Sequence, residues 1–204
     1  FLLKLSYEKI FMRMCSSYGH ALFCIILFQI LYVLLMFFVI SKSNYKKFIF
    51  YVKETIPSYL TAFSTMSSNA AIPVTTKSIE RTTGNYGFAH MATPILANVH
   101  MIGDAIAIPI ISIVTMKIFF GYTPGIYQYF KFVTYFCTML FASSGIPGGG
   151  IIIMLPFLKS VFGFTTEMSS LAITLHLLQD SFGTASNVSG DGALAIIVNK
   201  FIKN

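Results

Sequence analysis

Charged residues are scarce in this 204-residue sequence. They make up 10% of it, against roughly 25% in an ordinary soluble domain, so the chain lacks the polar coat that water requires. Tryptophan is absent, and the three cysteines (Cys15, Cys24 and Cys137) are too widely spaced to form a metal or redox motif. These scarcities exclude a water-soluble globular domain and indicate a membrane protein.

The net charge of +7 does not indicate nucleic acid binding, because the basic residues are scattered singly between apolar runs and form no basic face. A multi-pass protein of the cell membrane (the inner membrane in a Gram-negative bacterium) with positively charged loops fits this pattern better. We therefore expect a lipid bilayer and no nucleic acid partner.

One long apolar run is present. Residues 21–40 are apolar except for Gln29, and about 20 such residues span a bilayer. The chain opens on Phe1 without a signal-peptide pattern. We expect residues 1–18 to be the N-terminal segment of a truncated chain, and residues 19–204 to form one unit.

The later apolar runs are interrupted by polar residues, glycine and proline. Irregular backbone at membrane depth survives only inside protein or beside water, so these interruptions predict re-entrant hairpins. One tip falls at Ser67-Ser68-Asn69 and another in residues 143–150. The predicted fold is all-α and membrane-integral, in this order: helix 20–41, hairpin 45–80, broken helix 87–120, hairpin 126–163, helix 166–201. Paired interrupted segments indicate a transporter binding site.

The last helix carries a polar stripe. At about 100° per residue, five polar side chains fall within about 80° of one another: His176, Asp180, Thr184, Asn187 and Asp191. Acids at the bilayer centre need a compensating partner, and no lysine or arginine lies in this part of the helix. A bound cation is the partner we expect. The alternative is a polar seam between helices, satisfied by hydrogen bonds.

His100 and Asp104 are four residues apart, which places them on one face of a continuous helix. A proton relay, an ion site and a hydrogen-bonded pair are equally open interpretations of this spacing.

Four segments, in the same order, resemble the dicarboxylate/amino acid:cation symporter family of glutamate and serine/threonine transporters. They cover about residues 19–204: Ser67-Ser68-Asn69-Ala70-Ala71-Ile72-Pro73-Val74-Thr75; Asn98-Val99-His100-Met101-Ile102-Gly103-Asp104; Gly145-Ile146-Pro147-Gly148-Gly149-Gly150; and Leu178-Gln179-Asp180-Ser181 with Thr184, Asn187, Ser189 and Asp191. The resemblance implies that this chain is the C-terminal transport-core half, which moves as an elevator against a scaffold in a homotrimer.

The resemblance also implies roles for single residues. Asp180 would bind the substrate amino group, and Asn187 its carboxylate. Ser68 and Asn69, with the backbone around Ile146, would close over that carboxylate; we add Gly148 and Thr184 to this substrate set. Asp191 would be a cation ligand, together with the Asn187 carbonyl. Asn98 and Ser143 would lie near a second cation site, and His100 completes the predicted cation set.

Two departures from the family pattern affect specificity. The arginine that binds an acidic side chain in the family is replaced by Gly183, and its alternative location by Met66. A second substrate carboxylate would be buried unpaired, so we expect a small neutral amino acid. Ile102 replaces an aspartate and His100 an asparagine. Sodium is the coupling ion that we expect first, with a proton as the alternative; no cofactor is expected.

Two other functions were weighed. An intramembrane aspartyl protease needs its two aspartates on different helices and in motifs that are missing around Asp180 and Asp191. An inactive remnant of a transporter would account for the lost ligand positions at Ile102 and Gly183. We expect no enzymatic activity.

Overall fold

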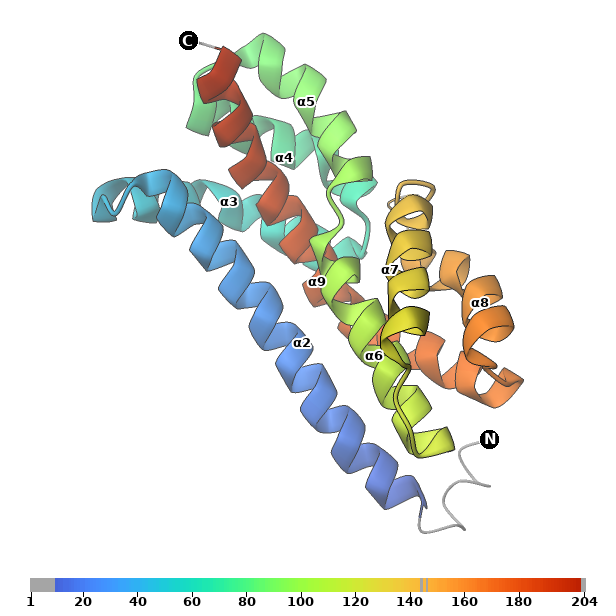
Figure 1. Cartoon of the computed structure of the whole chain (residues 1–204). Helices are drawn as coiled ribbons and strands as arrows, with labels where there is room; N and C mark the ends of the chain where they lie inside the picture. The colour runs from blue at the N-terminus through green and yellow to red at the C-terminus, as the bar shows by residue number, and fades with distance from the viewer. Residues whose placement is uncertain (1–9, 144, 146, 203–204) are drawn as a thin grey trace.

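The chain forms an assembly of helices (Figure 1). The computed structural model describes residues 10–143, 145 and 147–202, and these residues form helices without a strand, which confirms the all-α prediction for them. The helices are α2 (Ile10–Ser41), α3 (Tyr45–Thr65), α4 (Ser68–Thr83), α5 (Tyr86–Val99), α6 (Ile102–Phe120), α7 (Ile126–Leu140), α8 (Gly149–Phe162) and α9 (Thr166–Ile202).

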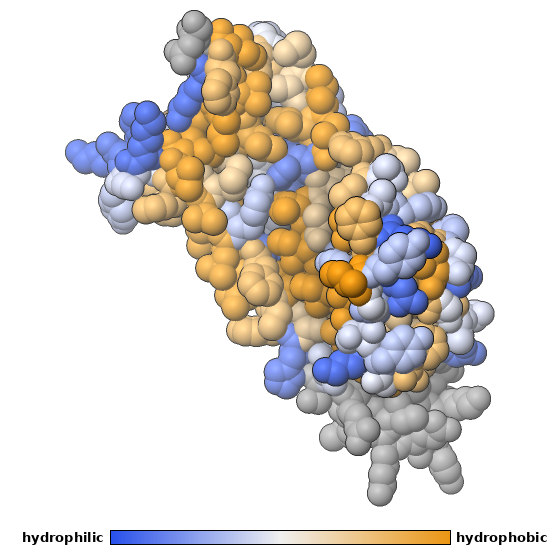
Figure 2. All heavy atoms as spheres, in the orientation of Figure 1, coloured by the Kyte–Doolittle hydropathy of each residue, from blue (hydrophilic) through white to orange (hydrophobic). Residues whose placement is uncertain are grey.

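Helix α2 is long, apolar and largely uncovered. In the described chain, two helical stretches are long and apolar enough to cross a bilayer: Ser17–Ser41 within α2, and Tyr86–Phe120 across α5 and α6. Only 22% of the most apolar window of the first is buried, and large side chains such as Phe23, Leu35 and Val39 are exposed. Figure 2 shows hydrophobic surface along much of the visible length of the molecule. Such a surface suits a lipid or protein neighbour better than water.

Helix α9 is the structural centre. It contacts α2, α3, α4, α5, α6 and α8, and residues from His176 to Asn199 include nine buried polar side chains. A helix with this many buried polar groups needs hydrogen-bond partners from its neighbours. Of these neighbours, α2 is continuous, whereas the others begin or end at an interruption of an apolar run.

Three interruptions bring free backbone groups towards α9. Helices α3 and α4 pack together and are joined at Met66, which has a left-handed conformation, and Ser67, which caps α4. The long apolar run breaks at His100-Met101, between α5 and α6. Helices α7 and α8 also pack together, and α8 begins after Gly148. That each packed pair enters and leaves the membrane from one side stays a prediction.

Basic residues gather where α2 ends. Lys42, Lys46 and Lys47 are exposed there, and the ammonium of Lys200, near the end of α9, donates to the carbonyl of Ile40 (3.2 Å). Basic segments far apart in the sequence therefore lie at one end of the molecule, as expected for a single membrane surface.

Helices α6 and α9 touch through glycine. A Cβ added to Gly103 would collide with the backbone of Gly183, so this close approach requires glycine at position 103. The contact sets the distance between the broken helix and the polar face of α9.

Gly103→Ala should therefore force α6 away from α9 and lower the free energy of unfolding by about 1–3 kcal/mol. Thermal unfolding of the purified protein in detergent measures this loss. Gly87→Ala in α5 is the control, because its Cβ meets no atom within 4 Å. An unchanged melting temperature for Gly103→Ala would contradict the close contact.

Candidate functional site

The two predicted tips meet each other. The Ser67 hydroxyl donates to the carbonyl of Gly145 at 2.7 Å, although the two residues are 78 positions apart. A Cβ on Gly145 would lie 3.3 Å from atoms of both Ser68 and Asn69. Ser68 is buried and Asn69 is exposed. The structure thus brings the first tip against the second; Ile146 lies outside the described residues.

Asp180 binds the start of α8. Its Oδ2 accepts the backbone N–H of Gly148 at 2.8 Å, and its Oδ1 accepts the Thr184 hydroxyl at 3.1 Å. Gly148 has φ +69°, and an added Cβ would lie 3.1 Å from Leu177, so the conformation and the close packing both favour glycine. A helix N-terminus with free N–H groups stabilises a carboxylate.

Asn187 binds the start of α6. Its side-chain Oδ1 accepts the N–H of Gly103 at 2.6 Å, and its backbone carbonyl lies 3.3 Å from Nδ1 of His100. The first N–H groups of a helix have no partner within that helix. Asn187 supplies one of them with an acceptor.

Asp191 is completely buried and lies beside His100. Its Oδ1 is 3.1 Å from Nδ1 of His100, and the Tyr32 hydroxyl is 3.1 Å from Nε2 of the same ring. The other oxygen, Oδ2 of Asp191, is buried and has no hydrogen-bond partner among the described residues. A buried carboxylate oxygen without a donor is a strong attractor for a cation.

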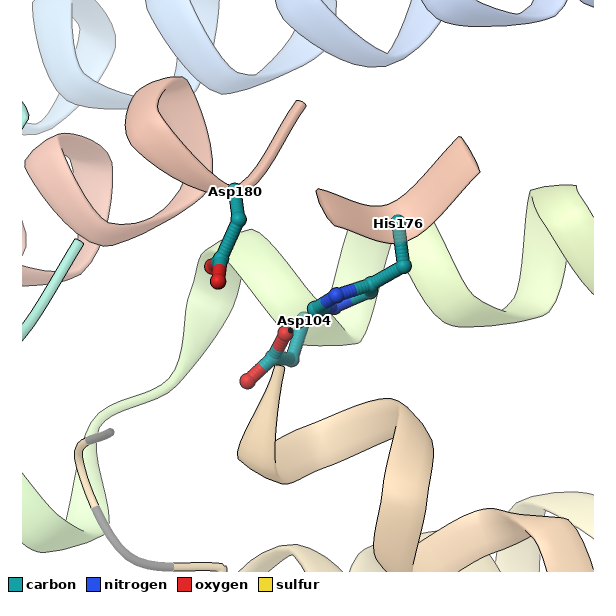
Figure 3. Close-up of side chains that lie close together, drawn as sticks. All are labelled: Asp104, His176 and Asp180. Atoms are coloured by element: carbon teal, nitrogen blue, oxygen red, sulfur yellow. Dashed lines mark hydrogen bonds and ion pairs between the residues drawn. The ribbon is translucent and has the colours of Figure 1, made fainter. Parts of the chain in front are cut away.

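The expectation that His100 and Asp104 share one helical face is wrong. The helix breaks at His100-Met101, so the two side chains are not on one helical face. His100 binds Asp191, whereas Asp104 accepts from or shares a proton with Nε2 of His176 on α9 at 2.7 Å. Figure 3 shows Asp104, His176 and Asp180 together, with both α9 side chains directed towards Asp104.

The expectation that the acids of the stripe lack a protein partner is wrong in part. Their partners are histidine and freed backbone N–H groups on other elements, not lysine or arginine. Asp180 has the Gly148 N–H and the Thr184 hydroxyl, and Asp191 has His100 on one oxygen. A cation as partner remains a prediction, supported at Asp191 by the unpartnered Oδ2.

Asn98 and Ser143, which are predicted to lie near a second cation site, have other hydrogen-bond partners in the described chain. The Asn98 amide donates to the carbonyl of Pro94 in its own helix. Ser143 is buried, and its backbone N–H donates to Leu140. Their roles stay predictions.

Gln29 and Gln179 form a pair that the sequence analysis did not predict. Nε2 of Gln29 donates to Oε1 of Gln179 at 2.8 Å and to the carbonyl of Gly103 at 3.2 Å. A Cβ on Gly183 would lie 3.2 Å from Oε1 of Gln179, so this pair lines the position of the missing arginine. The signal for Gln29 was present, since a lone polar residue in an apolar span needs an internal partner. No local sequence pattern indicated that Tyr32 would contact His100.

An all-helical chain with apolar candidate spans, and a buried polar site built where helices are interrupted, has the features of a multi-helix membrane protein with an internal binding site. Residues 3–201 match the sodium:dicarboxylate symporter family, and the chain belongs to that family.

Individual relatives support this membership. The serine/threonine transporter SstT of Acinetobacter baylyi is 27% identical over 197 residues, which cover 92% of this chain and 48% of the relative. SstT of Acinetobacter baumannii is 32% identical over 142 residues, 66% of this chain and 34% of the relative. An excitatory amino acid transporter of Caenorhabditis elegans is 30% identical over 174 residues, 83% of this chain and 33% of the relative. The chain thus spans between a third and a half of the length of these relatives.

The family consists of transporters, not enzymes. Asp180 and Asp191, the two acids of the protease alternative, are eleven residues apart on one helix, a rise of about 16 Å, so they do not share a proton as a catalytic dyad does.

Asn187→Ala should leave the buried N–H of Gly103 without an acceptor, at a cost of about 1–3 kcal/mol in the free energy of unfolding. Hydrogen exchange read at Gly103 should also become faster. Asn98→Ala is the matched control, since its half-buried amide bonds only within its own helix. Equal effects of the two substitutions would contradict the special role of Asn187.

Proposed function

We propose that this chain is the substrate-binding half of a symporter that moves a small neutral amino acid together with a cation. Sodium is the first candidate for that cation. The two packed helix pairs, α3–α4 and α7–α8, act as re-entrant hairpins. By analogy with the family, this half moves as an elevator against a scaffold supplied by the rest of the protein, within a homotrimer in the cell membrane.

One observation carries the proposal: the helix starts at two interruptions donate to the polar face of α9. The Gly148 N–H binds Asp180 and the Gly103 N–H binds Asn187, while the Ser67–Gly145 bond holds the two hairpin tips against each other. An amino acid needs an anionic site for its ammonium and N–H or hydroxyl donors for its carboxylate. Asp180 offers the first, and the tips of the two hairpins offer the second.

The surroundings of the site favour a neutral side chain. Glycine occupies position 183, and the Gln29–Gln179 pair lines the adjacent space without a positive charge. Asp104 adds a carboxylate beside Asp180. Of the two arginines in the sequence, Arg81 pairs with Glu54 on α3 and has a 67% exposed side chain. A second substrate carboxylate would meet negative charge without a guanidinium, which opposes its burial.

The cation site is proposed at Asp191. Its carboxylate is buried, one oxygen is unpartnered, and the Asn187 carbonyl approaches the same histidine ring. Sodium prefers such oxygen ligands. His100 supports the alternative of proton coupling, because its imidazole lies against the buried Asp191 carboxylate and can carry a proton.

Thermal stability in detergent tests substrate class directly. Serine or alanine, in the presence of sodium, should stabilise the protein, by about 2.7 kcal/mol at 100 times the dissociation constant. Aspartate should not, and Asp180→Asn should remove the response to serine because the ammonium loses its counter-charge.

The outcomes separate the alternatives. Stabilisation by aspartate would contradict the argument from Gly183 and Asp104. A folded sample that responds to no pair of amino acid and cation would favour the inactive remnant over the symporter.

Asp191→Asn tests the cation. The variant should lose the sodium dependence of the serine response, because the buried amide no longer balances an ion. Choline chloride at equal ionic strength is the reference, and Glu54→Gln, which removes an outlying carboxylate, is the control. A serine response that follows pH instead of sodium, and disappears in His100→Gln, would assign the coupling to a proton.

A further inference from the structure

Asp104, His176 and Asp180 form a cluster that the proposed transport cycle uses only in part. One potential ligand atom from each lies within 4.8 Å of the others (Figure 3). We propose that this cluster binds a divalent transition-metal ion of the Zn²⁺ class, and that the bound ion blocks the amino acid site. The inhibitory role rests on the proposed function; the ion site itself does not.

The residue types and their spacing suit such an ion. His176 and Asp180 are four residues apart on α9 and share one face, the spacing at which a helix presents two ligands to one metal. Asp104 completes the set from α6. One imidazole and two carboxylates, with a fourth position open, match the three-ligand sites that hold zinc in proteins.

The distances require only small side-chain movements. Ligands around tetrahedral zinc are about 3.4 Å apart when each bond is near 2.05 Å. The Asp104–His176 pair, at 2.7 Å, has to open slightly, and every other separation in the cluster is at most 4.8 Å. When His176 binds the ion, its ring gives up only the hydrogen bond between Nε2 and Asp104. The other ring nitrogen, Nδ1, is buried and has no partner among the described residues, so it has no hydrogen bond to lose.

Charge supplies the driving force. Even with His176 protonated, two carboxylates and one imidazolium carry a net charge of −1. In the described chain, the side chains of this cluster bond to Gly148, Thr184 and one another, and to no lysine or arginine. His176 is 1% exposed and Asp180 is 6% exposed, so water screens this charge poorly. A divalent cation neutralises it.

Glycine backbone closes the cluster on one side. A Cβ on Gly150 would lie 2.7 Å from Cγ of Asp104, so the first turn of α8 rests directly on this carboxylate. Because Gly148 is also bonded to Asp180, an ion here is held beneath the tip of the α7–α8 pair. The ion and the substrate ammonium both require Asp180 and therefore exclude each other.

Titration of the purified, tag-free protein with Co²⁺ tests the site, since the visible absorption of Co²⁺ reports nitrogen and oxygen ligands. Zn²⁺ should displace Co²⁺. His176→Gln and Asp104→Asn should each weaken Co²⁺ binding by about 100-fold or more, above the 10- to 100-fold typical of losing an outer-shell partner. Asp104→Asn keeps the shape of the side chain and an oxygen that can accept a hydrogen bond from His176, so this variant should still fold. His90→Gln removes an imidazole outside the cluster, which lies tilted against the ring of Tyr86, and this variant should bind Co²⁺ like the unaltered protein.

Binding lost in both cluster variants and kept in His90→Gln supports the site. Unchanged binding in folded His176→Gln and Asp104→Asn overturns it. Serine should raise the apparent dissociation constant for Co²⁺; Co²⁺ binding without any amino acid response would leave the metal site standing and remove the proposed transport role. A serine response without Co²⁺ binding would support the proposed transport role and overturn the metal site.

Discussion

A buried polar helix depends on neighbours that are not complete helices. An intact helix satisfies its own backbone and has no N–H to offer, except at its start. Helix α9 carries carboxylates and amides through the interior, so it needs such starts beside it. Gly103 and Gly148 supply them, each donating to a different α9 side chain. The breaks between α5 and α6, and before α8, are therefore a requirement of the α9 stripe.

Two histidine–aspartate pairs join the broken helix to α9 in opposite senses. In one pair the break contributes His100 and α9 contributes Asp191; in the other α6 contributes Asp104 and α9 contributes His176. A proton can move within either pair without any change in the net charge of that pair. This arrangement lets α9 keep acidic groups at depth with less electrostatic cost than isolated carboxylates would carry.

The sequence predicted the elements better than their contacts. Interrupted apolar runs and a polar stripe follow local periodicity, and both were visible without a structure. The shared face expected for His100 and Asp104 was wrong because it requires a continuous helix through His100-Met101, where the backbone is broken. The contact between Asp104 and His176 spans 72 positions and depends on how α6 is placed against α9, which no local pattern encodes. Gln29 was noticed as an exception, but its partner was not identifiable.

The packing around Gly183 constrains how this protein can change over evolutionary time. A side chain at position 183 would press on the amides of Gln29 and Gln179, and Gly103 already touches the same backbone. A long basic residue there would have to displace these amides. A change of substrate preference made through position 183 would therefore also change the contacts between α2 and α9 that the glutamine pair provides.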